Sequence, residues 1–138
     1  MVMLSELATV ERALANKVYD AGCTLIQLSA TKGEVVYLEK AKKVDTKYAV
    51  IISNELVLPK YLYYAISNEI EHFMARYMQG LNIVCEDISF MDVHWMRKEH
   101  QYVVIALLDV IEVLIEIEAK IIELLKLLKL YFLENMFI

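Results

Sequence analysis

Turn-forming and cross-linking residues are scarce in this sequence. Its 138 residues include three glycines, one proline and two cysteines. This scarcity excludes a disordered chain, a collagen-like chain and most small all-β folds. The two cysteines, Cys23 and Cys85, are too few for a disulfide scaffold. A chain of this length corresponds to one ordinary domain, so two independent hydrophobic cores are not expected.

An excess of positive charge is also missing. Fourteen basic residues against nineteen acidic ones give a formal net charge of −5 at pH 7. This balance excludes a generally basic nucleic-acid coat protein but leaves room for a local basic patch. Hydrophobic residues make up 59% of the chain. Even so, the longest apolar run in its most hydrophobic segment, residues 102–108, is far shorter than the roughly 20 residues that a membrane span needs. Glu6 and Glu11 precede any long apolar run, so we expect no secretion signal, no membrane partner and a cytoplasmic location.

Hydrophobic patterning predicts an α/β (α+β) domain over residues 1–95. Strands are predicted at residues 24–29, 34–38 and 47–53, with a tight turn at Lys32 and Gly33. A helix is predicted from Pro59, whose missing N–H costs nothing at a helix start, to about Met78. We also expect a short helix over residues 4–14, capped by Ser5, and strands at residues 81–85 and 89–94.

One long helix is predicted over the last third of the chain. Residues 98–134 contain neither glycine nor proline. Apolar residues that alternate at spacings of four and three form a heptad seam over four heptads. The seam consists of Val103, Leu107, Val110, Leu114, Ile117, Ile121, Leu124, Leu128 and Tyr131. A second apolar stripe beside it makes the apolar face wider than a two-stranded coiled coil needs.

The length of this helix indicates what it does. At about 1.5 Å per residue it is roughly 55 Å long. A helix of that length cannot lie buried on a compact body of about 95 residues. We therefore expect residues 96–138 to protrude as a coiled-coil helix that serves dimerisation or partner docking.

Several segments follow one another in a distinctive order. The long helix opens with KEHQ (98–101) and closes with LKLLKLYFLENMF (125–137). Upstream stand LSELA (4–8), GEVVY (33–37), YAVII (48–52) and LPKYLYY (58–64). This order resembles the specificity subunit of type I restriction–modification systems, in which a target recognition domain leads into a long helix. A full specificity subunit carries two of each and this chain carries one, so the resemblance implies a half-length subunit that works as a homodimer.

The resemblance implies a non-catalytic subunit without a cofactor. Such a subunit binds double-stranded DNA and positions the methyltransferase (modification) and restriction subunits on a split target. If two copies pair antiparallel, roughly 55 Å of helix spans about 16 base pairs, and two identical domains would read a split palindrome. The wide apolar face would leave room for the methyltransferase subunit to dock. The alternative is a helix used for homodimerisation alone.

DNA recognition requires cations for phosphates and bidentate groups for bases. The candidate phosphate contacts are Lys32, Lys40, Lys42, Lys43 and Lys47. The candidate base readers are Arg76, Gln79 and Asn82, which flank Gly80 in a predicted loop. The alternatives are an ordinary solvated surface for the lysines and a plain helix end for the second group.

Catalytic and metal-binding patterns are not visible in the sequence. His72, His94 and His100 have no ligand-like spacing to one another or to the cysteines. There is no glycine-rich phosphate loop, nucleophile elbow or methyltransferase cofactor motif. We therefore predict no catalytic residue, no metal and no cofactor. The acidic charge and the short recognition domain keep a second hypothesis open: an interaction protein that does not read DNA and regulates or inhibits restriction–modification subunits through its helix.

Overall fold

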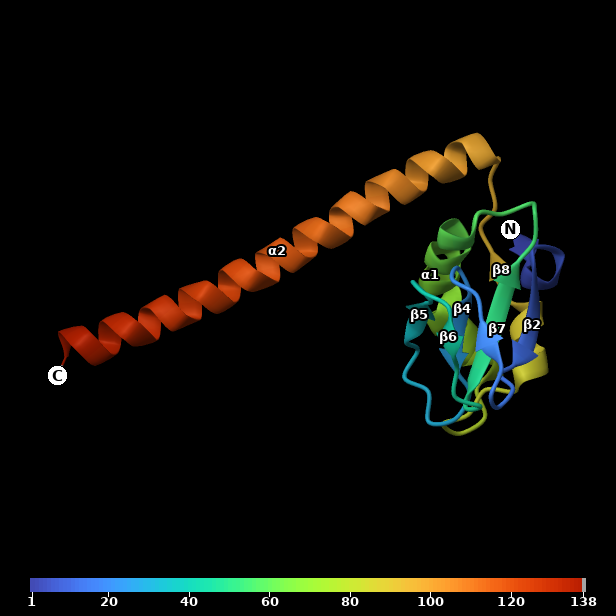
Figure 1. Ribbon diagram of the computed structural model, residues 1–138, viewed down its shortest axis with the longest axis horizontal. Coiled ribbons are helices and arrows are strands. Elements are labelled where there is room, and N and C mark those ends of the chain that lie inside the picture. Colours follow the sequence, from blue (N-terminus) through green and yellow to red (C-terminus); the bar gives the residue numbers. More distant parts are fainter. Residues whose placement is uncertain (138) are drawn as a thin grey trace. The chain divides into compact units, whose positions relative to one another are not determined.

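The chain forms two compact units in the computed structural model, which describes residues 1–137 (Figure 1). The first unit is Met1–Tyr102, and the second begins at Val103. The division into functional domains 1–95 and 96–138 stays a prediction, and Ile138 lies outside the described residues.

A four-stranded antiparallel sheet forms the centre of the first unit. Its strands lie in the order β2–β7–β4–β5, with β2 at Ala8–Arg12, β4 at Thr24–Gln27, β5 at Val35–Tyr37 and β7 at Tyr48–Ser53. The predicted strands at 24–29, 34–38 and 47–53 are therefore confirmed, with slightly shorter ends. The connection between β4 and β5 is longer than the predicted tight turn and occupies residues 28–34.

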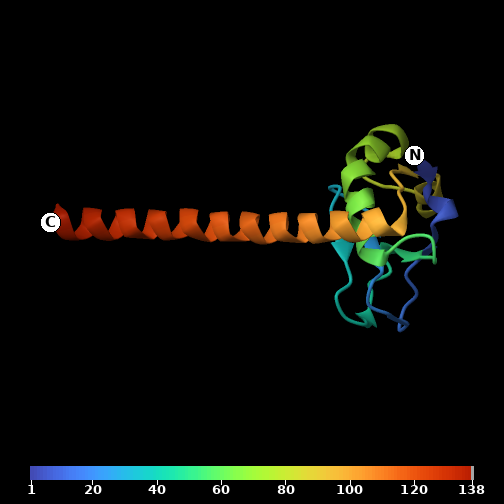
Figure 2. The ribbon, with the colours of Figure 1, turned by 90° about the horizontal axis from the view of Figure 1, so that it is seen from above.

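The sheet is covered on both faces. Helix α1, Pro59–Tyr77, packs on β4, β5 and β7 and lies on one side of the sheet in both ribbon views (Figures 1 and 2). The predicted helix is thus confirmed, and it buries Leu62, Ile66, Ile70 and Phe73 as its spacing indicated. On the other face, a two-stranded ribbon of β3 (Val18–Tyr19) and β6 (Lys42–Lys43) carries the buried Tyr19 into a cluster with Leu25 and Val50.

Two local predictions were wrong. Residues 4–14 do not form a helix: β1 (Val2–Met3) and a 3-10 turn, η1 (Leu4–Glu6), lead into strand β2. Pairing of all five residues of β2 with β7 outweighs the weak helical spacing. Residues 81–85 do not form a strand, because the chain turns back at Gly80 (φ +64°) and then enters η2, Cys85–Phe90. Within the predicted strand at 89–94, only β8 (Asp92–Val93) is extended in a ladder, and it pairs with β1.

The predicted long helix is confirmed as α2, Lys98–Met136. Its 39 residues correspond to about 58 Å at 1.5 Å per residue. All nine seam residues are exposed, from 47% at Ile117 to 64% at Leu124. An apolar surface this continuous is unusual for a monomer.

The first turn of α2 is tied to the first unit by Gln101, which is fully buried (0% exposed). Its Oε1 accepts a hydrogen bond from Leu58 N (2.8 Å), and its Nε2 donates to Met96 O (2.7 Å) and Leu56 O (3.3 Å). Trp95 Nε1 donates to the same Leu56 oxygen at 2.9 Å. At 100° per residue Gln101 and Val103 point to nearly opposite sides of the helix.

Replacing Gln101 with leucine should destabilise the first unit by about 2 kcal/mol, because the Leu58 N–H and two carbonyl groups lose their buried partner. Urea unfolding followed by Trp95 fluorescence measures this change. Gln79→Leu, at an exposed position, is the control and should shift the midpoint much less. Equal stability of Gln101→Leu and the parent protein would contradict the anchoring role.

Candidate nucleic-acid interface

One end of the sheet gathers most of the loops of the first unit. Strands β2 and β4 both end there and β7 begins there, since Arg12 pairs with Ala49 and Gln27 with Tyr48. We call this region, with its loops 13–17, 28–34, 44–47 and 79–83, the polar end. Strand β7 then runs from the polar end to Ser53, after which the chain reaches the Leu56–Leu58 segment that holds Gln101. The polar end and the start of α2 therefore lie at opposite ends of the sheet.

Backbone hydrogen bonds hold the loops of the polar end together. Leu28 N donates to Lys47 O and Ile83 N to Leu28 O, both at 2.8 Å. Thr31 N donates to Leu81 O at 3.0 Å, and Ala30 N to the Asn82 Oδ1 at 3.2 Å. These bonds bring together the loops that carry Lys32, Lys47, Gln79 and Asn82, and all four side chains are exposed.

The other predicted DNA contacts lie elsewhere in the first unit. Lys40 follows β5 at the opposite end of the sheet, next to Leu38, whose carbonyl accepts from Gly22 N at 2.8 Å. Lys42 and Lys43 form β6, opposite Tyr19 and Val18 of β3. Arg76 lies in the last turn of α1. The structure thus brings four of the eight predicted residues together at the polar end and leaves the other four at separate places, and DNA contact stays a prediction for all of them.

Arg12 is a cation at the polar end that the sequence did not single out. It is exposed at the end of β2, and its Nε donates to Thr46 O at 2.8 Å, which fixes the guanidinium beside the loop of Lys47. Within residues 1–137, no carboxylate lies within ion-pair distance of Arg12, Lys32 or Lys47, whereas Lys17 is paired with Glu11 at 3.1 Å. The sequence could have indicated the position of Arg12 only if residues 8–12 had been assigned to a strand.

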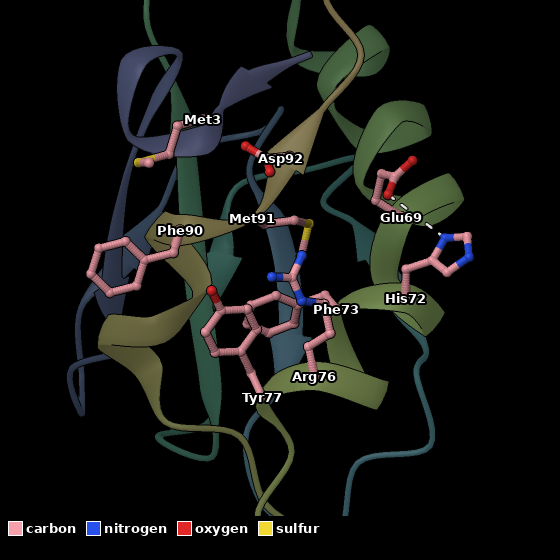
Figure 3. A pocket seen from close by; sticks show the side chains of 9 residues that line it. All are labelled: Met3, Glu69, His72, Phe73, Arg76, Tyr77, Phe90, Met91 and Asp92. Atoms are coloured by element: carbon pink, nitrogen blue, oxygen red, sulfur yellow. Dashed lines mark ion pairs between the residues drawn. The ribbon is translucent and has the colours of Figure 1, made fainter.

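A pocket of about 230 Å³ lies between α1 and the β1–β8 ribbon (Figure 3). It is lined by Met3, Glu69, His72, Phe73, Arg76, Tyr77, Phe90, Met91 and Asp92. Arg76 points into this pocket, with its guanidinium carbon 5.9 Å from the Tyr77 ring centre. His72 Nδ1 lies 3.8 Å from a Glu69 oxygen, three residues earlier on the same helix, so the two side chains meet across one helical turn. Among the described residues, no cluster of three or more His, Cys, Asp or Glu side chains could hold a metal ion.

The two thiols are packed inside the first unit. Cys23 is buried and Cys85 is half-buried, and both are free. Burial raises the pKa of the Cys23 thiol and of the Cys85 thiol, because it disfavours the thiolate. The structure therefore gives neither cysteine the electropositive, accessible setting of a nucleophile.

No family model and no curated protein matches the sequence, but solved structures do match the fold. The type I restriction–modification S subunit of M. genitalium aligns over 97% of this chain and 44% of its own, with a TM-score of 0.71 and 14% identity. The HsdS subunit of Thermoanaerobacter tengcongensis aligns over 86% of this chain and 38% of its own, with a TM-score of 0.66 and 14% identity. The fold is that of type I specificity subunits.

A third match comes from a structure that describes complex assembly and conformational transition of the type I system. It aligns over 88% of this chain and 32% of its own, with a TM-score of 0.64 and 20% identity. This chain spans less than half the length of each of the three proteins. In the part of the chain that the structure describes, no helix is long and apolar enough to span a membrane.

Burial should slow the reaction of both thiols with iodoacetamide. At pH 8 we expect the folded protein to react at least about tenfold more slowly than free cysteine, because a raised pKa leaves less thiolate. Unfolding in urea should remove the difference, and mass spectrometry reports both rates. Fast native alkylation at Cys23 or Cys85 would contradict the burial of that thiol.

Proposed function

We propose that this chain is a half-length, homodimeric specificity subunit of a type I restriction–modification complex. The observation that carries the proposal is the alignment of 97% of the chain with 44% of a specificity subunit, which is close to one of its two halves. In this proposal the chain binds double-stranded DNA in the cytoplasm and positions the methyltransferase and restriction subunits. It holds no cofactor and performs no catalysis itself.

The exposed seam of α2 supports the homodimer. Nine consecutive seam positions carry apolar side chains that are about half exposed or more. Full burial of a side chain of this size is worth about 1.5–3 kcal/mol, and covering the exposed half of one is worth roughly half of that, so nine such residues on each of two copies would hold a pair firmly. Two identical recognition units at the ends of paired helices suit a target made of two separated half-sites.

The polar end supports DNA binding by each recognition unit. Arg12, Lys32 and Lys47 would contact phosphates, and Gln79 and Asn82 would reach base edges. The polar end is remote from the anchor of α2, so DNA contact there would not compete with the attachment of the helix. Lys40, Lys42, Lys43 and Arg76, which lie elsewhere in the first unit, are kept as further proposed contacts.

In-vitro selection from random duplex DNA tests this function. The purified full chain would be mixed with a candidate modification subunit, and enriched duplexes would be sequenced. We expect a split palindrome with a fixed spacer. The acidic net charge of −5 favours the alternative hypothesis, a regulator that binds the modification subunit without reading DNA. An intact protein complex that enriches no sequence would establish that alternative.

Charge reversal separates the two groups of lysines. Lys32→Glu with Lys47→Glu, at the polar end, should weaken duplex binding by at least about tenfold and flatten its salt dependence, because phosphate contacts are replaced by repulsion. Lys42→Glu with Lys43→Glu, on β6, makes the same change in net charge and is the matched comparison. Fluorescence anisotropy of a labelled duplex measures both. A larger loss from the β6 pair would move the interface away from the polar end.

Charges in the seam should separate the copies. Leu114→Glu with Ile121→Glu should lower the mass measured by light scattering to the 16.0 kDa of one chain, or cause aggregation. The matched control, Glu116→Gln with Glu123→Gln, changes exposed residues outside the seam and should leave the assembly intact. An unchanged mass for the seam variant would show that the seam does not hold the copies together.

A further inference from the structure

The pocket between α1 and the β1–β8 ribbon has apolar side chains on both of its walls (Figure 3). On the α1 wall the rings of Phe73 and Tyr77 are stacked, with their centres 4.8 Å apart. Met3 and Phe90 lie on the facing wall and are 40% and 50% exposed, so they offer apolar surface that the fold itself does not cover. A flat ring system in this pocket would find aromatic or apolar surface against both of its faces.

The charged groups of the pocket lie on different walls and have opposite signs. Arg76 points into the pocket from α1, and its guanidinium carbon lies 5.9 Å from the Tyr77 ring centre, within the range of a cation–π contact. Asp92 comes from β8, on the facing wall. Among the described residues, no carboxylate lies within ion-pair distance of Arg76. The guanidinium donors are therefore available to a ligand.

The size and the chemistry of the pocket together select a ligand class. Its volume of about 230 Å³ is below the roughly 300–1,000 Å³ of pockets for drug-sized ligands, so a single nucleobase suits it better than a base pair. An arginine donates in parallel to two neighbouring acceptors, which guanine offers at O6 and N7, whereas adenine presents a donor beside N7. A carboxylate accepts from N–H groups, which guanine offers on its other edge, at N1 and the 2-amino group.

We propose that this pocket binds a guanine base. Tyr77 and Phe90 contact the faces of the base, Arg76 donates to O6 and N7, and Asp92 accepts from N1 and the 2-amino group. Two sources share this chemistry: a free guanine nucleotide and an unpaired guanine in a nucleic-acid strand. Arg76 precedes Gln79 of the polar end by three residues, so the pocket adjoins the proposed DNA contacts. The inference goes beyond the proposed function and does not depend on the homodimer.

Isothermal titration calorimetry of the full chain with GMP and with AMP tests the inference. We expect GMP to bind at least about tenfold more tightly, because only guanine presents two neighbouring acceptors to Arg76. Arg76→Met keeps the apolar stem and removes the guanidinium, so it should weaken GMP binding by at least about tenfold. The matched control, Arg97→Met, makes the same change at an exposed position outside the pocket and should leave the affinity unchanged. Circular dichroism checks that both variants fold.

Modified bases test each contact without altering the protein. The 7-deaza analogue of GMP lacks the N7 acceptor, so the parent protein should bind it more weakly than GMP, and Arg76→Met should bind the two alike. IMP lacks the 2-amino group, so the parent protein should bind it more weakly than GMP, and Asp92→Asn should reduce that difference. Equal binding of GMP and its 7-deaza analogue by the parent protein would overturn the role of Arg76.

A single-stranded oligonucleotide with one guanine among thymines, compared with its adenine counterpart, separates the two sources. Guanine-dependent binding tighter than that of GMP assigns the pocket to an unpaired base. Binding of GMP without guanine-dependent binding of the strand assigns it to a free nucleotide. Absence of both, equal binding of GMP and AMP, or GMP binding that Arg76→Met leaves intact overturns the proposal. Duplex selection and light scattering test the proposed function separately, so the failure of either proposal is distinguishable.

Discussion

The uncovered apolar surface of α2 is the constraint on which the rest of the account depends. Within the described residues, the seam side chains of this helix remain about half exposed or more, although they follow a regular heptad pattern. Such a surface is stable in water only when another helix covers it. The second stripe makes the same demand on another flank. The exposed seam therefore favours a quaternary structure that covers it, and the proposed homodimer supplies one. Antiparallel copies would place the four carboxylates of residues 103–119 along the lysines of residues 120–136 of the other helix.

Two features of the first unit suit the proposed assembly. The three hydrogen bonds of Gln101 attach the start of α2 through side-chain contacts that face away from the seam. The antiparallel sheet then separates the polar end from the anchor of α2, because β7 connects the polar end to the segment that holds Gln101. Under the proposed function, the loops that would contact DNA and the helix that would contact protein can thus be altered independently.

The sequence predicted elements whose periodicity is long or clear. Strand β7, helix α1 and helix α2 follow from β-branched alternation, from Pro59 and from the heptads. Residues 8–12 misled the prediction because five residues can suit both a strand and a helix, and only pairing with β7 decides between them. The polar end could not be predicted from the sequence for a similar reason. The proximity of Lys32, Lys47 and Asn82 depends on strand register and on loop hydrogen bonds. The sequence marked Gln101 only as part of the KEHQ segment. Its anchoring role became clear only from the hydrogen bonds that it makes with Leu56, Leu58 and Met96.

Disulfide formation across the seam tests the antiparallel pairing of α2 most directly. Leu114→Cys and Leu124→Cys would be prepared separately in a Cys85→Ser background, mixed under reversible association, and then oxidised. The account predicts cross-linked chains in the mixture and almost none from either variant alone, because Leu114 lies opposite the partner's Leu124 when the paired segments are centred on Ala119. Efficient cross-linking of Leu114→Cys by itself would show parallel helices and would contradict the account.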